Sequence, residues 1–498
     1  MKDISKSKIL AYRQCPKRLW LEIHRRELLQ NSASAEARFA TGHEVGEVAR
    51  RIYDPKGKGA LVDRENRQID AALARTAELL ATSQPIFEAG FSGGGALAFA
   101  DVLLPIRINK ERGWRMVEVK SSTKVKPPYR DDAAIQAYIA RAAGLPLLSI
   151  AIAHINTKFV YPGGGDYQKL LTEEDLTKEA FGREKEVKEW VAEAQVIARK
   201  RKEPAIGTGP QCCDPYECGF FEYCQSQEPH AEFPASWLPR VQTKALKTHL
   251  EENDATDLRN VPDHFLNELQ LRVKKHTLSG ATYFDAAGAA ADLAKYKLPA
   301  YFLDFETILR AVPIWKGTRP YQQIPFKFSA HRLSRTGKLT HESFLDLSGT
   351  DPSKAFSEAL IAACCQRGPV FVYNASFEKS RIKELADRFK GLKNSLLPIG
   401  ERIIDLLDIT RKRYYHPSQQ GSWSIKKVLP TVAPDLNYEK LKGVQDGEMA
   451  MSAFLEAIAS GTTKARKEEI ERQLTEYCGL DTLGLVRVWE VFSGRKVG

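Results

Sequence analysis

Long hydrophobic runs are missing from this sequence of 498 residues. The longest mostly apolar stretch, Gly144 to Ile155, is too short for a membrane-spanning helix, which needs about 20 apolar residues. The first residues, Met1 to Lys8, lack the apolar core of a secretory signal. We therefore expect a soluble, cytoplasmic protein that has no membrane partner.

Cysteine is scarce, with 8 residues, and a strong excess of either charge is also missing. In a cytoplasmic protein, a group of cysteines indicates metal or redox chemistry rather than a disulfide framework. The 74 basic and 63 acidic residues leave a net charge of +11. This mild basic excess fits a phosphate-rich partner, but many basic proteins bind no nucleic acid, so charge alone leaves both alternatives open.

The composition, 43% hydrophobic and 28% charged, excludes a wholly disordered chain. The length suits two or three domains of about 150 residues each. Alternating helix and strand patterns predict an α/β domain over residues 1–230 and a second over 298–498. Residues 231–297 show no strand pattern and are expected to form a helical connector or a small DNA-binding hairpin. Helices are predicted near residues 9–21, 36–52, 68–81 and 133–143, and strands near 86–89, 96–104, 114–120 and 147–155.

An aspartate and a Glu-x-Lys triplet lie on two neighbouring predicted strands. Glu118 and Lys120 share one face of their strand because strand side chains alternate. A hairpin would bring Asp101 beside them. Carboxylates bind Mg²⁺ or Mn²⁺, and a lysine can orient water and stabilise charge on an attacked phosphate. This pattern indicates phosphodiester hydrolysis, although such triplets also occur by chance.

Residues around this triplet strengthen the assignment. His43 follows Gly42 on a predicted helix upstream of the strands, and Gln136 and Tyr138 lie on the helix that follows them. In this order the motifs resemble the RecB-like branch of the PD-(D/E)xK nucleases, which have a restriction-endonuclease-like fold. The resemblance implies that Gln136 and Tyr138 line the site and contact nucleic acid. Glu88 is a further candidate carboxylate.

The same resemblance implies a role for each residue of the first motif set. His43, Asp101, Glu118 and the carbonyl of Val119 would be metal ligands. Lys120 would be the catalytic lysine, acting together with the Asp101 and Glu118 carboxylates.

Three cysteines, Cys212, Cys218 and Cys224, follow a C-x5-C-x5-C spacing, and Cys15 lies far upstream. Thiolates select zinc or an iron–sulfur cluster, and this spacing lacks the C-x2-C pairs of structural zinc sites. The set resembles the iron–sulfur clasp of the AddB subunit and of CRISPR-associated RecB-like adaptation exonucleases. The resemblance implies a [4Fe-4S] cluster on these four cysteines. Cys213 is a competing thiol, and zinc remains an alternative.

The third motif set lies in the C-terminal block. Asp304 and Glu306 share one face of the predicted strand 301–307. Tyr477 and Asp481 are four residues apart in a helical stretch and also share a face.

Between these motifs, Asn374 and Glu378 follow a short apolar strand. In this order the motifs resemble the DEDDy branch of the DnaQ-like 3′–5′ exonucleases, which have an RNase H-like fold.

This second resemblance implies that Asp304, Glu306 and Asp481 hold two metal ions and that Tyr477 orients the attacking water. Glu378 takes the position at which the family usually carries aspartate. Its extra methylene moves the carboxylate, so exonuclease activity could be slower, prefer Mn²⁺ or be absent.

Asn374 matches a residue common in this motif and is a candidate contact for nucleic acid. Basic and aromatic residues also alternate after the second motif, at Arg411, Arg413, Tyr414 and Lys426. Such residues suit a nucleic-acid strand, because cations meet phosphates and rings stack on bases. A solvated loop with packed aromatics is the alternative.

The whole chain therefore resembles a RecB-like iron–sulfur nuclease fused to a DnaQ-like exonuclease. We expect a metal-dependent DNA nuclease in DNA repair or in defence against foreign DNA, acting on single strands or DNA ends. A helicase or defence-system partner is expected. An RNA-processing nuclease and a nucleic-acid-binding module with a non-catalytic C-terminal domain are the alternatives.

Overall fold

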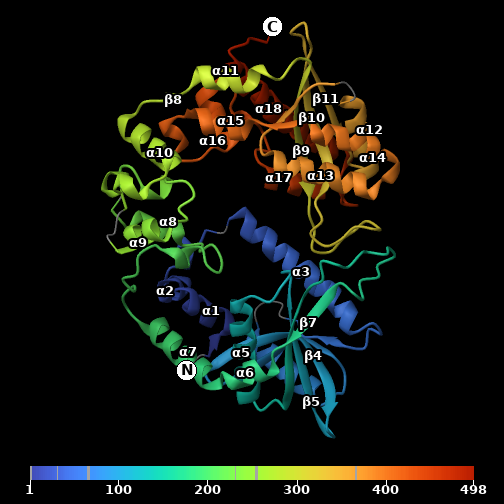
Figure 1. The fold of residues 1–498 in the computed structure, drawn as a ribbon. Coiled ribbons are helices and arrows are strands. Elements are labelled where there is room, and N and C mark those ends of the chain that lie inside the picture. The colour runs from blue at the N-terminus through green and yellow to red at the C-terminus, as the bar shows by residue number, and fades with distance from the viewer. Residues whose placement is uncertain are drawn as a thin grey trace. The chain divides into compact units, whose positions relative to one another are not determined.

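The computed structural model of the chain describes residues 3–30, 32–63, 68–229, 231–252, 256–364 and 367–497. The chain divides into two compact units, the first made of Met1–Pro229 with Arg310–Gln322 and the second of His230–Leu309 with Gln323–Gly498. Helices surround β-sheets in both units (Figure 1), so the protein is of the mixed α/β class, as predicted. No helix in the described ranges is both long enough and apolar enough to cross a bilayer.

The first unit is built on a seven-stranded sheet. Its strands are β1 (Ile4–Ser5), β2 (Ala60–Leu61), β3 (Ile86–Gly93), β4 (Ala96–Ile108), β5 (Glu111–Lys120), β6 (Leu147–Ile155) and β7 (Leu171–Asp175). The order is β2-β3-β4-β5-β6-β7, and β1 pairs with β4. Gly94 and Gly95, at φ 63° and 82°, turn β3 into β4. Glycine suits this turn because it adopts positive φ without steric cost.

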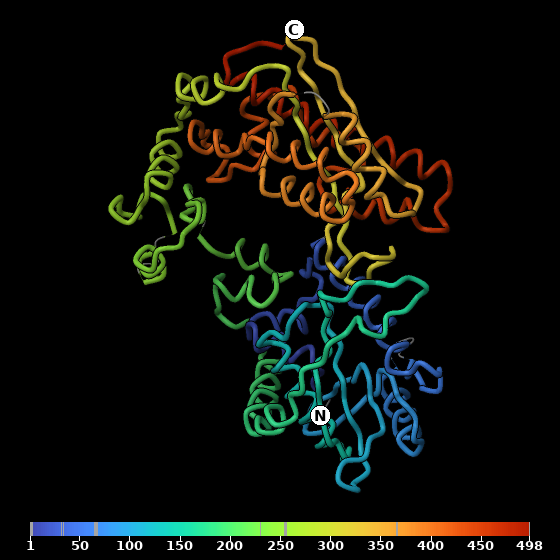
Figure 2. Tube along the Cα trace, turned by 45° about the vertical axis from the view of Figure 1, so that its right-hand side comes forward, coloured from blue at the N-terminus to red at the C-terminus, as the bar shows by residue number. Residues whose placement is uncertain are grey.

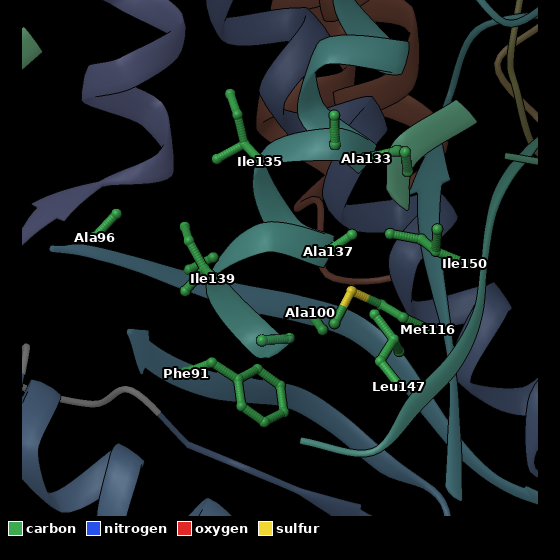
Figure 3. Packing of buried hydrophobic residues seen from close by; sticks show 14 of the residues in the cluster. Phe91, Ala96, Ala100, Met116, Ala133, Ile135, Ala137, Ile139, Leu147 and Ile150 are labelled. Atoms are coloured by element: carbon green, nitrogen blue, oxygen red, sulfur yellow. The ribbon is translucent and has the colours of Figure 1, made fainter. Parts of the chain in front are cut away.

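Helices cover this sheet. They are α1 (Lys6–Gln14), α2 (Pro16–His24), α3 (Ala33–Tyr53), α4 (Ile69–Leu80), α5 (Pro127–Ala142), α6 (Thr177–Gly182), α7 (Glu184–Arg199) and α8 (Phe221–Ser226). The helix α5 contacts β3, β4 and β6. Figure 3 shows Ala133 and Ala137 of α5 above the strands, near Ala100 and Met116. Small side chains at this contact let α5 lie close to the sheet.

The prediction of one unbroken opening helix from residue 9 to residue 21 is wrong. The structure has two helices, because Cys15 is extended (φ −162°, ψ 122°) and Pro16 begins α2. The proline ring clashes with a helical conformation of the preceding residue and is well suited to a helix start. The break gives Cys15 a position of its own between the two helices.

A segment from the middle of the chain completes the first unit. Residues 310–322 lie against α3 and the chain around residues 159–170 (Figure 2). The Tyr161 N–H donates to the Thr318 carbonyl at 2.9 Å, and the Tyr321 hydroxyl donates to the Ser121 carbonyl. Ser121 directly follows Lys120, so this segment reaches the end of β5.

The second unit contains a five-stranded sheet of order β11-β10-β9-β12-β13 and a separate β8–β14 pair. Its strands are β8 (Tyr283–Phe284), β9 (Ala300–Ile308), β10 (Ile324–Leu333), β11 (Leu339–Leu345), β12 (Val370–Val372), β13 (Ile403–Asp405) and β14 (Tyr414–Tyr415). The strand β9 lies in the middle, antiparallel to β10 and parallel to β12.

The second unit also contains several α-helices. They are α9 (Lys244–Glu252), α10 (Glu268–Ser279), α11 (Ala286–Ala294), α12 (Ser353–Ala363), α13 (Ala375–Arg388), α14 (Lys393–Glu401), α15 (Leu406–Arg413), α16 (Ile425–Val432), α17 (Gly447–Ile458) and α18 (Lys464–Ser493). The long α18 contacts both β9 and β10. It therefore brings C-terminal residues beside the central strand.

The predicted connector 231–297 belongs to this second unit. It is mostly helical and has a small apolar cluster that includes Leu246, Leu258 and Val261. It also contains β8, which pairs with β14. The expectation that this segment holds no strand was wrong, because a two-residue strand is too short to show an alternating pattern.

Candidate functional site

Asp101, within β4, lies beside the Glu-x-Lys triplet at the end of β5. The antiparallel register pairs Val102 with Val117, which places Asp101 across from Glu118. The Asp101 carboxylate accepts a hydrogen bond from the Val119 N–H at 2.7 Å. The structure thus brings together the carboxylates that the sequence pattern had paired.

Two lysines and two carboxylates form an ion network at this site. The Glu118 Oε1 atom lies 2.8 Å from both Lys6 Nζ and Lys120 Nζ. The Asp132 carboxylate on α5 lies 2.9 Å from Lys6 Nζ and 2.5 Å from Lys120 Nζ. Both carboxylates are buried, at 3% exposure. Sequence reasoning missed Lys6 and Asp132, although Asp132 precedes Gln136 by one helical turn.

The charges of this network perturb one another. Burial and the neighbouring Glu118 raise the pKa of Asp101 to about 8. Burial alone would raise the pKa of Asp132, but Lys120 and Lys6 outweigh it and hold that pKa well below its usual range. Burial would lower the pKa of Lys120, but Asp132 and Glu118 raise it well above the ordinary value. The lysine is therefore a fixed positive charge rather than a base.

A cavity of about 660 Å³ opens over this network. His43 from α3, Glu88 from β3 and Val119 from β5 line it together with Asp101, Glu118 and Lys120. The metal-ligand candidates of the first motif set thus share one cavity.

Gln136 and Tyr138 lie on the same helix but in different places. The Gln136 side chain is 1% exposed and donates to the Glu118 carboxylate. Its Oε1 atom is buried and has no hydrogen-bond partner in the described part of the chain. The Tyr138 hydroxyl donates to the Gly94 carbonyl at 3.2 Å, at the β3–β4 turn. Gln136 therefore belongs to the site, whereas Tyr138 supports the distant turn.

The cysteines gather in one apolar cluster. Cys212, Cys218 and Cys224 are buried beside Trp20 and Phe220. Burial raises the pKa of Cys224 to about 11, and the thiols of Cys218, Cys212 and Cys15 act in the same direction.

Two hydrogen bonds tie the Cys15 segment to the C-terminal cysteines. The Gln14 side chain donates to the carbonyls of Gln211 and Tyr216, each at 2.7 Å. Cys15 therefore lies with the later cysteines, whereas Cys213 is exposed. In the described ranges, three or more of these sulfur atoms do not come within 4.8 Å of one another, so a metal group bound by these cysteines stays a prediction.

The second unit holds a compact acidic site. Asp304 and Glu306 project from β9, and Asp481 comes from α18. Their ligand atoms all lie within 4.8 Å of one another, and they are the one such group of three or more ligating side chains in the described ranges. Carboxylate oxygens are the preferred ligands of Mg²⁺ and Mn²⁺. The donor set therefore fits a divalent cation.

Glu378 lies in the first turn of α13 and is 2% exposed. Its Oε2 atom has no hydrogen-bond partner within the part of the chain that the structure describes. The Asp405 carboxylate accepts the N–H groups of Asn374 and Ala375, at 3.1 and 2.9 Å, and so fixes the start of this helix. Asn374, at φ 92°, forms the turn that presents Glu378.

These carboxylates disfavour one another's charged forms. Burial raises the pKa of Glu306 to about 8, and Asp481 acts in the same direction. Burial also raises the pKa of Glu378 to about 8 and that of Asp481 to about 6. The pKa of Asp304 lies well above its usual range because of burial and then Asp481, Glu306 and Glu378. A divalent cation would relieve this repulsion.

Two tyrosines and a lysine border the acidic site. The Tyr438 hydroxyl donates to Asp481 Oδ1 at 2.6 Å. The Tyr477 ring lies 6.3 Å from the Tyr438 ring, and Lys426 Nζ is 5.8 Å from each ring centroid. Sequence reasoning missed Tyr438, because it lies in a short turn outside the three motifs.

Two of the residues predicted to contact nucleic acid, Arg413 and Tyr414, are occupied by contacts within the protein. The Arg413 guanidinium pairs with Asp285 and, at 2.8 Å, with Asp292. Tyr414 is 5% exposed and packs in the core, so its ring offers no face for stacking on a base. For these two residues, the structure favours the alternative from the sequence, a loop with packed aromatic residues, over a contact with nucleic acid.

Arg411 and Lys426 lie nearer the surface. Arg411 is 3.3 Å from Asp408, and Lys426 donates to the Gln445 carbonyl at 2.9 Å. Neither contact buries the cation, and Lys426 lies at the acidic site.

Comparisons with known proteins give similarities to part of the chain but no activity. A family model described as a domain of unknown function, DUF2779, matches residues 301–424. The matched span contains Asp304, Glu306 and Glu378. An uncharacterized MG366 homolog of Mycoplasma pneumoniae is 27% identical over 213 residues, covering 39% of this chain and 32% of the relative. The uncharacterized protein MG366 of Mycoplasma genitalium is 26% identical over 214 residues, with the same coverage. The chain thus matches about a third of the length of these relatives.

Proposed function

We propose that this chain is a metal-dependent DNA nuclease with two active sites, one in each unit. The first unit would be a RecB-like PD-(D/E)xK nuclease and the second an RNase H-like, DEDDy-type 3′–5′ exonuclease. The observation that carries the proposal is the acidic group of Asp304, Glu306 and Asp481, with the buried and unpartnered Glu378 oxygen beside it. The buried carboxylates repel one another, and no structural role offsets this repulsion in the described ranges. A divalent cation would stabilise the group.

In the second unit, Asp304, Glu306, Glu378 and Asp481 would hold Mg²⁺ or Mn²⁺. The bound cations would supply stabilisation of the charge that develops on the phosphate and on the leaving 3′ oxygen. Tyr477 would orient the attacking water. Water attack on phosphorus breaks the bond to the 3′ oxygen and shortens the strand from its 3′ end.

In the first unit, His43, Asp101, Glu118 and the Val119 carbonyl would hold the metal. Lys120 stays protonated beside Glu118 and Asp132, so it would stabilise negative charge on the attacked phosphate and orient the water. Asp132 would act as a positioning residue by holding the lysine at 2.5 Å.

The four-cysteine cluster supports a [4Fe-4S] clasp on Cys15, Cys212, Cys218 and Cys224. The clasp would pin the N-terminal helices to the segment that ends the domain. Zinc is the alternative, and iron, sulfide and zinc analysis of anaerobically purified protein distinguishes the two. About four irons per chain would support the cluster, and one zinc would overturn it.

A nuclease that acts on RNA is the second candidate, because no described feature selects against a 2′-hydroxyl. A binding module with a non-catalytic C-terminal domain is the third, because glutamate replaces aspartate at position 378. Either role would fit a partner such as a helicase, in repair or in defence against foreign DNA.

The test is digestion of matched, end-labelled DNA and RNA strands in Mg²⁺, in Mn²⁺ and with chelator. We expect metal-dependent shortening of DNA and none with chelator. Degradation of RNA alone would assign the RNA function. Binding without cleavage in either metal would assign the binding role.

A further inference from the structure

The helix α3 turns one face toward the cavity of the first unit. Phe39, Gly42, His43, Gly46 and Arg50 all line that cavity. Spacings of three and four residues place them along one side of a helix. Only His43 has a role in the metal site proposed above, so the rest of this face is unexplained.

The two glycines of this face, Gly42 and Gly46, make the helix less stable than alanine would. Glycine inside a helix is less favourable than alanine, because it loses more conformational freedom on folding. A Cβ atom added at Gly42 or at Gly46 would meet no described protein atom within 4 Å. Packing inside the protein therefore gives no reason for glycine at these positions. The open space lies on the cavity side.

Exposed apolar side chains gather at the same cavity. Phe39 is 62% exposed and Ile69 is 45% exposed, and both line it. A large aromatic ring left in solvent beside a candidate active site indicates a binding surface. Its flat face suits stacking on a nucleic-acid base, since every base offers the same kind of surface.

Two arginines lie on the same helix, one beside Phe39 and one about three turns further along. Arg38 and Arg50 both line the cavity, and their contacts are weak surface ones. The Arg38 guanidinium donates to Ser34 Oγ at 3.2 Å, and Arg50 lies 3.9 Å from Glu47. The two positions are separated by about 18 Å along the helix axis. Charges at this spacing can meet two phosphates of one strand that lie several nucleotides apart.

We propose that the α3 track, defined as Arg38, Phe39, Gly42, Gly46 and Arg50, binds the single strand that the first site cuts. A base stacks on Phe39, the backbone passes over the two glycines, and phosphates pair with the arginines. A duplex would not fit this arrangement, because its bases are already stacked on one another. The assignment rests on the nuclease function proposed above and names its substrate as single-stranded nucleic acid.

The test is the affinity of the full chain for a fluorescent oligothymidylate, measured by anisotropy in chelator so that nothing is cut. Phe39→Ala is expected to weaken binding by about fivefold or more. Gly46→Leu is expected to weaken it by about tenfold or more, while the melting temperature stays the same or rises. Arg50→Gln is expected to lower the slope of log K against log salt by about 0.7.

Matched controls lie elsewhere in the first unit. Gly182 is the last residue of α6, is exposed and also has open space at its Cβ position. Val196 on α7 is 60% exposed. Gly182→Leu and Val196→Ala should both leave the oligothymidylate affinity unchanged.

If Phe39→Ala and Gly46→Leu bind with the wild-type affinity, the α3 track is overturned. The proposed nuclease function is not affected by that result if the wild type still cuts. Equal affinity for a matched duplex would also overturn it. A wild type that neither binds nor cuts nucleic acid would remove the proposed function itself. If Gly46→Leu lowers the melting temperature, Phe39→Ala at its exposed position decides alone.

Discussion

Cation binding at the acidic site of the second unit should depend steeply on pH. Glu306 and Glu378 each have a pKa raised by burial to about 8. Both carboxyls are therefore mostly protonated at neutral pH, and a cation must displace their protons in order to bind. Affinity for Mg²⁺ or Mn²⁺ should rise with pH and level off above about pH 8.

The size of the effect follows from the number of protons. At pH 7 a carboxyl with a pKa of about 8 is about 90% protonated, so the two glutamates together release about two protons. The two glutamates alone should then lower the dissociation constant by about 100-fold between pH 6 and pH 7, and Asp304, whose pKa is also raised by burial, adds to this fall. Asp481, with a pKa raised by burial to about 6, adds to the slope at the acid end.

The assay is Mn²⁺ titration of the Asp101→Asn protein, in which the other site has lost a ligand. Glu378→Gln should reduce the slope of log Kd against pH by about one, because one of the displaced protons is gone. Asp387→Asn is the control, since Asp387 lies on the same helix with its side chain 57% exposed. An Mn²⁺ affinity equal at pH 6 and pH 8 would refute the reasoning.

Three further predictions concern the first unit. Lys120→Ala should abolish cleavage at the first site, read from the product pattern, yet lower the melting temperature little because Lys6 still pairs with both buried carboxylates. Loss of folding instead would make Lys120 structural. Cys15→Ser should lose brown colour and soluble yield together, and a stable, colourless and fully active variant would contradict the clasp. Tyr321→Phe should cost about 1 kcal/mol through its lost bond to Ser121, and an unchanged melting temperature would show that this contact is unimportant.

The sequence predicted the parts of each site that follow from short-range periodicity. Glu118 and Lys120 share a strand face, and the short turn at Asn109 and Lys110 brings Asp101 to them, so local rules suffice. Tyr477 and Asp481 likewise share a helix face. In each case the spacing alone determines which side chains meet.

The remaining residues depend on tertiary packing. Lys6 contacts Glu118, which is 112 positions away in the sequence. No local sequence pattern predicts that contact. Tyr438 approaches Asp481 from a turn without a motif. Arg413 and Tyr414 are residue types that often contact nucleic acid. In the structure, however, Arg413 forms ion pairs within the unit and Tyr414 is buried in its core. Composition cannot distinguish a solvent-facing side chain from a packed one.

The segment 310–322 shows the same limit on a larger scale. The sequence predicts one continuous C-terminal block, yet this stretch between β9 and β10 packs with the first unit. Its apolar residues, such as Ala311 and Val312, are buried there. Outside the segment itself, their partners lie about 140 residues or more away in the sequence, beyond the reach of any pattern within one block.

The most direct test of two independent nuclease sites is the product pattern on end-labelled single-stranded DNA in Mn²⁺. The wild type, Lys120→Ala, Asp304→Ala and the double variant are compared at equal folded concentration. Two sites predict that Asp304→Ala loses only 3′-end trimming, Lys120→Ala loses only the other products, and the double variant leaves the strand intact. Full cleavage by the double variant would contradict the assignment of both sites.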